Sequence, residues 1–469
     1  MDENTNELTN NEELKMKHTT ATLFATASLV LTACAATVDR IVVRQQWPWS
    51  PEVRVEYRLS DVTAPVDVTL TAYDGARQLD SAALAAATTG ERFAVSSNGD
   101  HVLTIDPVKA FGTSQIAFAD FKVRVDIAES PASMTEVLYK VIRISDGDCR
   151  DLTRADFLNG KVEGGYETDY SKIYSTYSTS LSDVLIWTGV TNNIAYKTTH
   201  IVMRHIKCKG VQWTMGGDRT LADAPECQVI LTNNFWIGVF PITVGQHTEI
   251  GSGNRSSYGV YPAEANLCPA TGWRDNIREK GSSVSWPANR HTVGTTSWLG
   301  KLRSKTGYDF ELPTEAQWEF AARAGVYHKE LYTGEEDMPR ASTTLENAVK
   351  RVAWYNTNSK VAGVSNTWHP VGSLKPNAFG IYDMLGGGAE YMLNRFYVYD
   401  TENIMYEPEG GDSTAKEVNR SYTMANGYAA NSRVCVRVYS TDLSSNGLRI
   451  ARVILPDTEG LVYPAWDKK

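Results

Sequence analysis

Residues 310–323 read Phe-Glu-Leu-Pro-Thr-Glu-Ala-Gln-Trp-Glu-Phe-Ala-Ala-Arg. This stretch predicts a helix over residues 314–324, because the Thr314 hydroxyl is a suitable N-cap and Gln317, three positions later, completes a capping box. Three apolar side chains have the spacing of one buried helix face, with Trp318 beside them: Ala316, Phe320 and Ala321. A second helix is expected upstream, over residues 296–305.

A second informative stretch, residues 376–386, reads Pro-Asn-Ala-Phe-Gly-Ile-Tyr-Asp-Met-Leu-Gly. Together the two stretches resemble the signatures of the formylglycine-generating enzyme family, also called the sulfatase-modifying factor family. Weaker similarity, such as Phe-Trp-Ile-Gly at 235–238 and Val-Ser-Trp at 284–286, extends the resemblance over residues 198–455. The resemblance implies a C-type-lectin-like α+β domain with much irregular structure.

Upstream, residues 38–128 contain short runs in which apolar and polar residues alternate. Examples are Val-Arg-Val-Glu-Tyr-Arg-Leu at 53–59 and Val-Asp-Val-Thr-Leu-Thr-Ala at 66–72. A period of two is typical of strands that bury one face. Turn residues separate the runs, so we predict an all-β sandwich of immunoglobulin-like type. Residues 129–197 are expected to be a connector, and residues 456–469 a tail.

The N-terminal residues 1–34 carry the pattern of an export signal. A basic start at Lys15-Met16-Lys17 precedes a short apolar run that ends Leu-Thr-Ala-Cys at 31–34, and translation could begin at Met16. This run is too short to span a bilayer as a helix. The ending matches a lipobox, which predicts lipidation of Cys34 and a membrane-anchored protein. Ordinary cleavage nearby would instead release a periplasmic or extracellular protein.

The resemblance implies a chemistry that depends on two cysteines, which bind Cu(I) and convert a sulfatase cysteine to formylglycine. Soft thiolates select Cu(I), and two of them must converge on one ion. Counting back from Arg437 places the two positions near Met424 and Ala429, and neither is a cysteine. Only Cys435 lies nearby, and it is expected to be a buried small hydrophobe, a remote catalytic candidate at most. Copper is therefore not expected.

The resemblance also implies a structural calcium site. It assigns ligand roles to the side chains of Asp383 and Glu390 and to the carbonyls of Gly386 and Gly388. Carboxylates and carbonyls are the hard oxygen ligands that calcium prefers. However, the usual Asn-Val-Trp of this stretch is replaced by Gly-Gly-Ala at 387–389.

The 469 residues carry a net charge of -9 without any run rich in Lys and Arg, which argues against nucleic acid as a partner. The histidines are scattered without metal-binding spacing. Of the six cysteines, Cys208 and Cys227 are far enough apart in sequence to pair in an oxidising compartment, but the sequence does not decide this.

These features predict an exported cell-envelope protein whose C-terminal domain is a non-catalytic ligand-binding or display module. Its partner would be an extracellular or periplasmic protein or glycan. The alternative is an oxidase of the formylglycine-generating type that acts on a protein cysteine. The missing cysteine pair favours the first interpretation.

Overall fold

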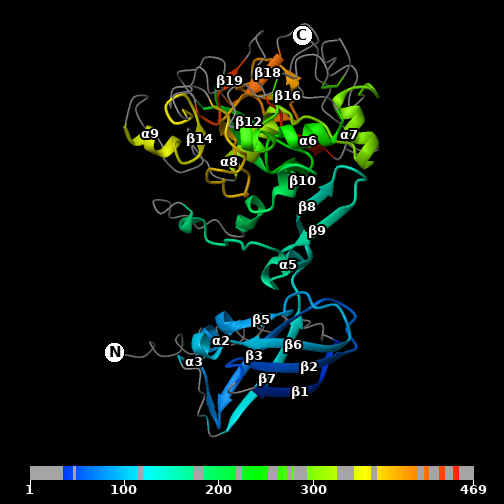
Figure 1. The fold of residues 1–469 in the computed structure, drawn as a ribbon, viewed down its shortest axis with the longest axis vertical. Helices are drawn as coiled ribbons and strands as arrows, with labels where there is room; N and C mark the ends of the chain where they lie inside the picture. The colour runs from blue at the N-terminus through cyan, green and yellow to red at the C-terminus, as the bar shows by residue number, and fades with distance from the viewer. Residues whose placement is uncertain are drawn as a thin grey trace, which may run out of the picture. The chain divides into compact units, whose positions relative to one another are not determined.

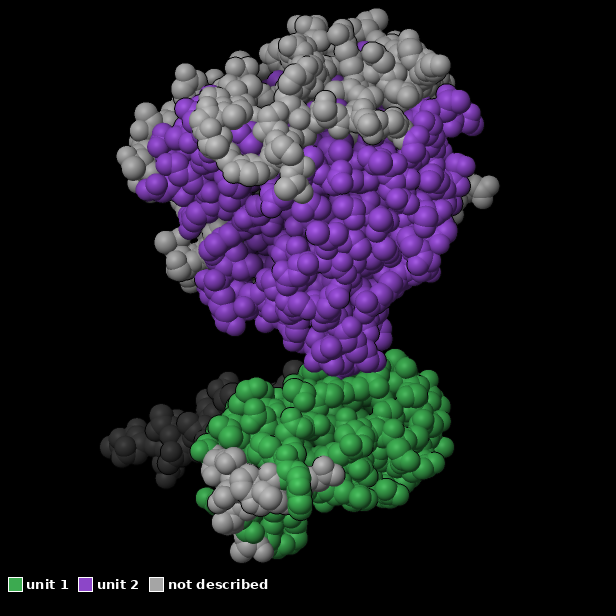
Figure 2. Space-filling view, viewed as in Figure 1, with its two compact units in different colours: residues 1–130 green, residues 131–469 purple. Residues whose placement is uncertain are grey.

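The computed structural model describes residues 35–45, 49–112, 118, 120–173, 184–217, 224–251, 262–271, 277–278, 293–324, 343–360, 367–408, 417–421, 432–438 and 447–453. The chain divides into two compact units, Met1–Ser130 and Pro131–Lys469 (Figure 2). Both helices and strands are present, in several small sheets, so the predicted α+β class is confirmed. Within the described residues, no helix has the length and apolar character needed to cross a membrane.

Unit 1 consists of two antiparallel sheets with strand orders β1-β2-β6-β5 and β4-β3-β7 (Figure 1). Two short helices, α2 (Ser81–Ala87) and α3 (Pro107–Phe111), accompany them. The strands are β1 (Thr37–Gln45), β2 (Val53–Ser60), β3 (Val66–Asp74), β4 (Arg77–Gln78), β5 (Thr88–Gly90), β6 (Gly99–Ile105) and β7 (Phe121–Glu129).

The core of unit 1 follows the alternation in the sequence. In β2 every second side chain is buried, and the same holds for the first half of β3. The buried side chains of both sheets form one cluster that includes Val55, Tyr57, Val68, Leu103 and Val125. Because the inner faces of two sheets bury a common core, unit 1 is built as a sandwich with two short helices. Its immunoglobulin-like type stays a prediction.

The largest sheet of unit 2 has the order β20-β13-β10-β8-β9. Its strands are β8 (Val137–Arg143), β9 (Cys149–Thr153), β10 (His200–Ile206), β13 (Phe235–Gly238) and β20 (Ala451–Val453). Residues 129–197 are therefore not a simple connector. They supply the β8–β9 hairpin, and β8 pairs along β10 from Arg143↔His200 to Tyr139↔Arg204 (Figure 1).

The rest of unit 2 is made of short elements. The remaining strands are β11 (Gln212–Met215), β12 (Cys227–Ile230), β14 (Ala353–Trp354), β15 (Leu385–Gly386), β16 (Glu390–Arg395), β17 (Met405–Tyr406), β18 (Glu417–Arg420) and β19 (Arg437–Val438). The helices are α4 (Ala132–Thr135), α5 (Arg154–Leu158), α6 (Val244–Glu249), α7 (Trp298–Thr306), α8 (Glu315–Arg323) and α9 (Thr343–Val349), with single 3-10 turns at 170–172, 188–191, 194–197 and 262–267.

Helix α8 is the predicted helix, and it begins as the sequence indicates. The Thr314 hydroxyl accepts a hydrogen bond from the Gln317 amide at 3.2 Å, and the Gln317 side chain accepts one from the Thr314 amide at 3.0 Å. Every described residue of α8 is buried, so the helix lies inside the unit rather than on its surface. Its polar side chains must therefore find partners within the protein.

Two glutamates on successive turns of α8 find these partners in two distant arginines and in Arg323 of the helix itself. Glu315 accepts two hydrogen bonds of 2.8 Å from the Arg437 guanidinium, a bidentate pair. Arg420 lies 3.1 Å from Glu315 and 2.5 Å from Glu319. Arg323 donates to Glu319 at 2.6 Å and 2.8 Å. This buried charge network fastens α8 to the ends of β18 and β19.

The glutamate that precedes α8 is part of a second buried pair. The side chain of Glu311 is fully buried. It accepts hydrogen bonds from Arg278 at 2.9 Å and 3.1 Å. Burial raises the pKa of Glu311, and the charge of Arg278 opposes this rise.

Candidate functional site

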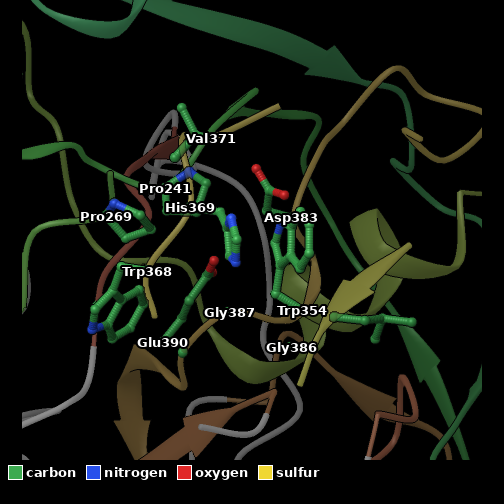
Figure 3. A pocket seen from close by; sticks show the side chains of 13 residues that line it. Pro241, Pro269, Trp354, Trp368, His369, Val371, Asp383, Gly386, Gly387 and Glu390 are labelled. Carbon is green, nitrogen blue, oxygen red and sulfur yellow. The ribbon is translucent and has the colours of Figure 1, made fainter. Parts of the chain in front are cut away.

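A pocket lies in unit 2 where the loop after β13, the β14–β15 pair and the start of β16 meet (Figure 3). Its free volume of about 20 Å³ is enough for one small chemical group. The lining combines aromatic rings, prolines, glycines and two carboxylates: Pro241, Pro269, Trp354, Trp368, His369, Val371, Asp383, Leu385, Gly386, Gly387, Gly388, Glu390 and Gly447. All four residues of the predicted calcium site are among them.

Backbone pairing sets one wall of the pocket. Strands β14 and β15 run parallel, with Trp354 opposite Gly386, and the Gly387 amide donates to the Trp354 carbonyl at 2.7 Å. A Cβ on Gly386 would lie 2.4 Å from that carbonyl, and the residue has a φ of +69°. Only glycine fits both constraints, so Gly386 holds the Trp354 backbone close to the glycine loop.

Two aromatic rings form the face of this wall. The His369 imidazole stacks on the Trp354 indole with 3.7 Å between ring centroids and an angle of 12°. Nε2 of His369 is 3.3 Å from the Ser359 carbonyl. Burial lowers the pKa of His369, and the contacts with Ser359 and Glu264 act in the opposite direction. Near neutral pH the stacked pair is therefore uncharged.

The facing wall contains Trp368 and the two prolines (Figure 3). Trp368 is 5% exposed and shares a buried cluster with Cys268, whose thiol points to the Trp368 carbonyl at 3.7 Å and the Glu264 carbonyl at 3.5 Å. Burial raises the pKa of Cys268 to about 12. Cys268 is thus a neutral thiol that packs behind the wall.

The Glu390 carboxylate reaches into the pocket between these walls (Figure 3). Both of its oxygens already accept hydrogen bonds. Trp318 of α8 donates to Oε2 at 2.7 Å, and Arg449 donates to Oε2 at 3.2 Å and to Oε1 at 3.0 Å. The Arg449 guanidinium also binds the carbonyls of Gly238 and Tyr382 at 2.8 Å. Glu390 is therefore a fixed anion with its countercharge beside it.

Asp383 occupies the upper edge of the pocket in a left-handed conformation, with φ of +55°. Its Oδ2 accepts a hydrogen bond of 2.7 Å from the Gly372 amide. Burial raises the pKa of Asp383 to about 6, although the Gly372 hydrogen bond and the charges of Arg449 and Lys197 lower it. Lys197 is itself 7% exposed, and burial lowers its pKa while Asp383 opposes this shift.

The arrangement of these groups does not fit a calcium ion. Both oxygens of Glu390 face cationic or N–H donors, and the carbonyl of Gly386 accepts from the Gly388 amide at 2.8 Å and the Ser421 hydroxyl at 3.3 Å. Calcium needs about six to eight oxygen ligands that are free of such donors. No cluster of three or more metal-binding side chains occurs among the described residues. Calcium at these four residues stays a prediction, and the geometry counts against it.

The cysteines that the sequence singled out differ in what the structure shows of them. Cys34, Met424 and Ala429 lie outside the described residues. Cys435 is fully buried, as expected of a small hydrophobe, and does not line the pocket. No disulfide joins Cys208 to Cys227; both are buried, and their thiols point to the carbonyls of Asn233 and Met215.

The sequence did not single out the aromatic and proline lining as a site. Trp354, Trp368 and His369 come from loops and a two-residue strand, so no periodic pattern marks them. The only local signal was their concentration in the two short runs 354–355 and 368–370, which contain Trp-Tyr and Trp-His-Pro.

The raised pKa of Asp383 leads to a test by pH. An unfolded aspartate titrates near 3.8 and the folded one near 6, so the folded state binds the proton more tightly and loses stability as pH rises through this window. Asp383→Asn cannot titrate, and asparagine tolerates a positive φ. The thermal midpoint of the variant minus that of the wild type should rise from pH 4 to about 6 and then stay level.

Asp400→Asn is the matched control. Hydrogen bonds from the Asn403 side chain and neighbouring amides lower the pKa of Asp400, so its stabilising effect is present above its unfolded pKa and is lost as pH falls. The thermal midpoint of Asp400→Asn should fall below that of the wild type as pH rises through the acidic range. If the difference in thermal midpoint from the wild type changed with pH in the same direction for both variants, the buried environment described for Asp383 would be wrong.

Calcium binding is tested in the same thermal experiment. The Glu390 carboxylate already accepts hydrogen bonds from Arg449 and Trp318. We therefore expect the same thermal midpoint for the full chain with millimolar calcium and with excess chelator. If calcium raised the midpoint and Asp383→Asn abolished the rise, the predicted ligand set would be correct.

The sequence is similar to that of known proteins. Residues 197–442 match the family model described as "Sulfatase-modifying factor enzyme 1-like domain". The formylglycine-generating enzyme of Streptomyces coelicolor is 30% identical over 167 residues, which are 35% of this chain and 48% of that protein. The Bos taurus enzyme of the same name is 27% identical over 180 residues, 37% of this chain and 44% of that protein. The chain thus spans about half the length of these relatives.

Two further proteins show the range of the similarity. "Inactive C-alpha-formylglycine-generating enzyme 2" of Bos taurus is 26% identical over 138 residues, 29% of this chain and 39% of that protein. Among solved structures, Treponema denticola variable protein 1 aligns with a TM-score of 0.42 and 21% identity over 54% of this chain and 96% of that one. Since the family model covers more than half of the 469 residues, the chain belongs to the sulfatase-modifying factor enzyme 1-like family.

Proposed function

We propose that unit 2 is a non-catalytic ligand-binding or display module and that the pocket is its ligand site. The observation that carries the proposal is the composition of the pocket. Aromatic and proline walls surround carboxylates that are held by buried donors, and none of the described cysteines lines it. Such a lining, mostly apolar with a few fixed polar groups, is typical of a binding site.

The chemistry of the cysteines supports the same proposal. Oxidation through copper needs two thiolates that converge. Counting back from Arg437 places these two thiols near Met424 and Ala429, and neither residue is a cysteine. Burial raises the pKa of Cys227 and of Cys268 to about 12, so these thiols do not ionise at neutral pH.

An oxidase remains the second candidate, because several relatives of this chain are named formylglycine-generating enzyme. Another relative is named an inactive form, so the names alone do not decide between the two. The aligned part covers about half of those relatives, so their activity is a second candidate function for this chain.

Export and anchoring belong to the proposal as well. The pattern before Cys34 would place the binding module at the cell envelope, held by a lipid on Cys34. Incorporation of a palmitate analogue into the wild type but not into Cys34→Ala would support the anchor, and equal labelling of both would remove it.

Activity is tested with a Cys-x-Pro-x-Arg sulfatase peptide, copper and oxygen. We expect no conversion of the peptide thiol to an aldehyde by mass spectrometry, while the Streptomyces coelicolor relative serves as the positive control. Conversion by this chain that is lost in Cys435→Ser would establish the oxidase instead.

A further inference from the structure

We propose that the pocket binds a neutral pyranose sugar, whose hydroxyl-bearing edge enters between the walls while the apolar C–H face of the ring lies on the aromatic side chains. This inference rests on the proposed binding function and specifies its ligand. It follows from the walls, the polar groups, the charge and the size of the pocket.

The walls offer flat apolar surfaces. The stacked Trp354 and His369 lie on one side, and Trp368 with Pro241 and Pro269 on the other (Figure 3). Trp354 and His369 are half-buried, so part of each ring remains accessible. Aromatic rings combine large apolar area with few rotatable bonds, so they bind a rigid apolar face at a low entropic cost.

The side chains and amides at the pocket require hydrogen-bond donors from the ligand. The amides of Gly387 and Gly388 donate to carbonyls within the protein, at 2.7 Å and 2.8 Å. The Asp383 carboxylate can accept further hydrogen bonds, because a carboxylate has about four acceptor positions. It accepts one hydrogen bond from the Gly372 amide, whereas both oxygens of Glu390 already accept hydrogen bonds from Trp318 and Arg449. Hydroxyl groups of the ligand supply the donors that complete the set of Asp383.

The charge balance selects an uncharged ligand. Glu390 is paired with Arg449 at 3.0 Å, and the charges of Arg449 and Lys197 both act on Asp383. Each carboxylate of the pocket therefore already has a cation that acts on it. Burying an ion without a partner is costly, so a neutral polyhydroxylated ring is favoured over an ammonium or a carboxylate.

The glycine loop determines the size of the pocket. A Cβ placed on Gly387 would meet no atom within 4 Å, and the family signature has a side chain here, asparagine. Because Gly387 has no side chain, the side of the pocket formed by the glycine loop stays open. The free volume of about 20 Å³ admits one edge of a ring rather than the whole ring. The remainder of the sugar, and any chain attached to it, would stay outside.

The experiment uses the full chain and a panel of methyl pyranosides, with saturation-transfer NMR to detect binding. We expect at least one pyranoside to bind with a dissociation constant on the order of millimolar and to receive saturation mainly on one face of the ring. Methylammonium, acetate and the aromatic fragment indole are the comparison probes.

Gly387→Asn restores the family side chain and should weaken sugar binding about tenfold or more, a change of about 1.4 kcal/mol. Gly210→Asn is its matched control, because Gly210 also has a positive φ (+74°), meets no atom within 4 Å and lies outside the pocket. That variant should bind like the wild type. If Gly387→Asn fails to fold, Gly388→Ala takes its place, since Gly388 lines the pocket without a left-handed φ.

The outcomes separate this inference from the function on which it rests. If indole or methylammonium bound, Gly387→Asn blocked that binding and no pyranoside bound, the module would stand and the sugar would be wrong. If a pyranoside bound equally to the wild type and Gly387→Asn, the pocket would not be its site. If no probe bound, the ligand site itself would be refuted.

Discussion

The structure of unit 2 depends on the buried ion pairs between helix α8 and the arginines of β18 and β19. Glu315, Glu319 and Arg420 are each fully buried, and removing such charges from water is costly unless every one is paired. The structure satisfies them by bringing α8, Arg420 and Arg437 together, although Glu319 and Arg420 are 101 positions apart and Glu315 and Arg437 are 122 apart. The charges therefore specify how segments with little regular structure must pack.

Helix α8 also contributes a hydrogen-bond donor to the pocket. The Trp318 indole donates to Glu390, and Arg449 holds Glu390 from the other side while it binds the backbone at Gly238 and Tyr382. This connection links the first signature stretch to the pocket. The first stretch supplies the Trp318 donor, and the residues that follow the second stretch, 387–390, supply the Glu390 carboxylate and two glycines of the pocket. A side chain held in this way can orient a ligand without reorganising.

The sequence predicted what depends on local patterns. The capping box of α8, the alternating strands of unit 1 and the convergence of Asp383, Gly386, Gly388 and Glu390 were all accessible from it, the last only through the resemblance. Residues 129–197 were misjudged as a connector, because the pairing of β8 with β10 joins distant segments and leaves no local signal. The roles of Arg449 and Trp354 were missed for the same reason, and Arg449 changes a predicted calcium ligand into half of an ion pair.

The central claim is that buried charges on α8 hold unit 2 together, and replacing one arginine tests it most directly. Arg420→Met leaves Glu315 and Glu319 short of a partner and should lower the free energy of unfolding by about 3–5 kcal/mol. Arg143→Met breaks an exposed pair with Asp146, in which the side chains are 43% and 51% exposed, and should cost at most about 1 kcal/mol. Native-state hydrogen exchange of the slowest amides in β8 and β10 measures both values for unit 2 alone. Equal, small losses for the two variants would contradict the account.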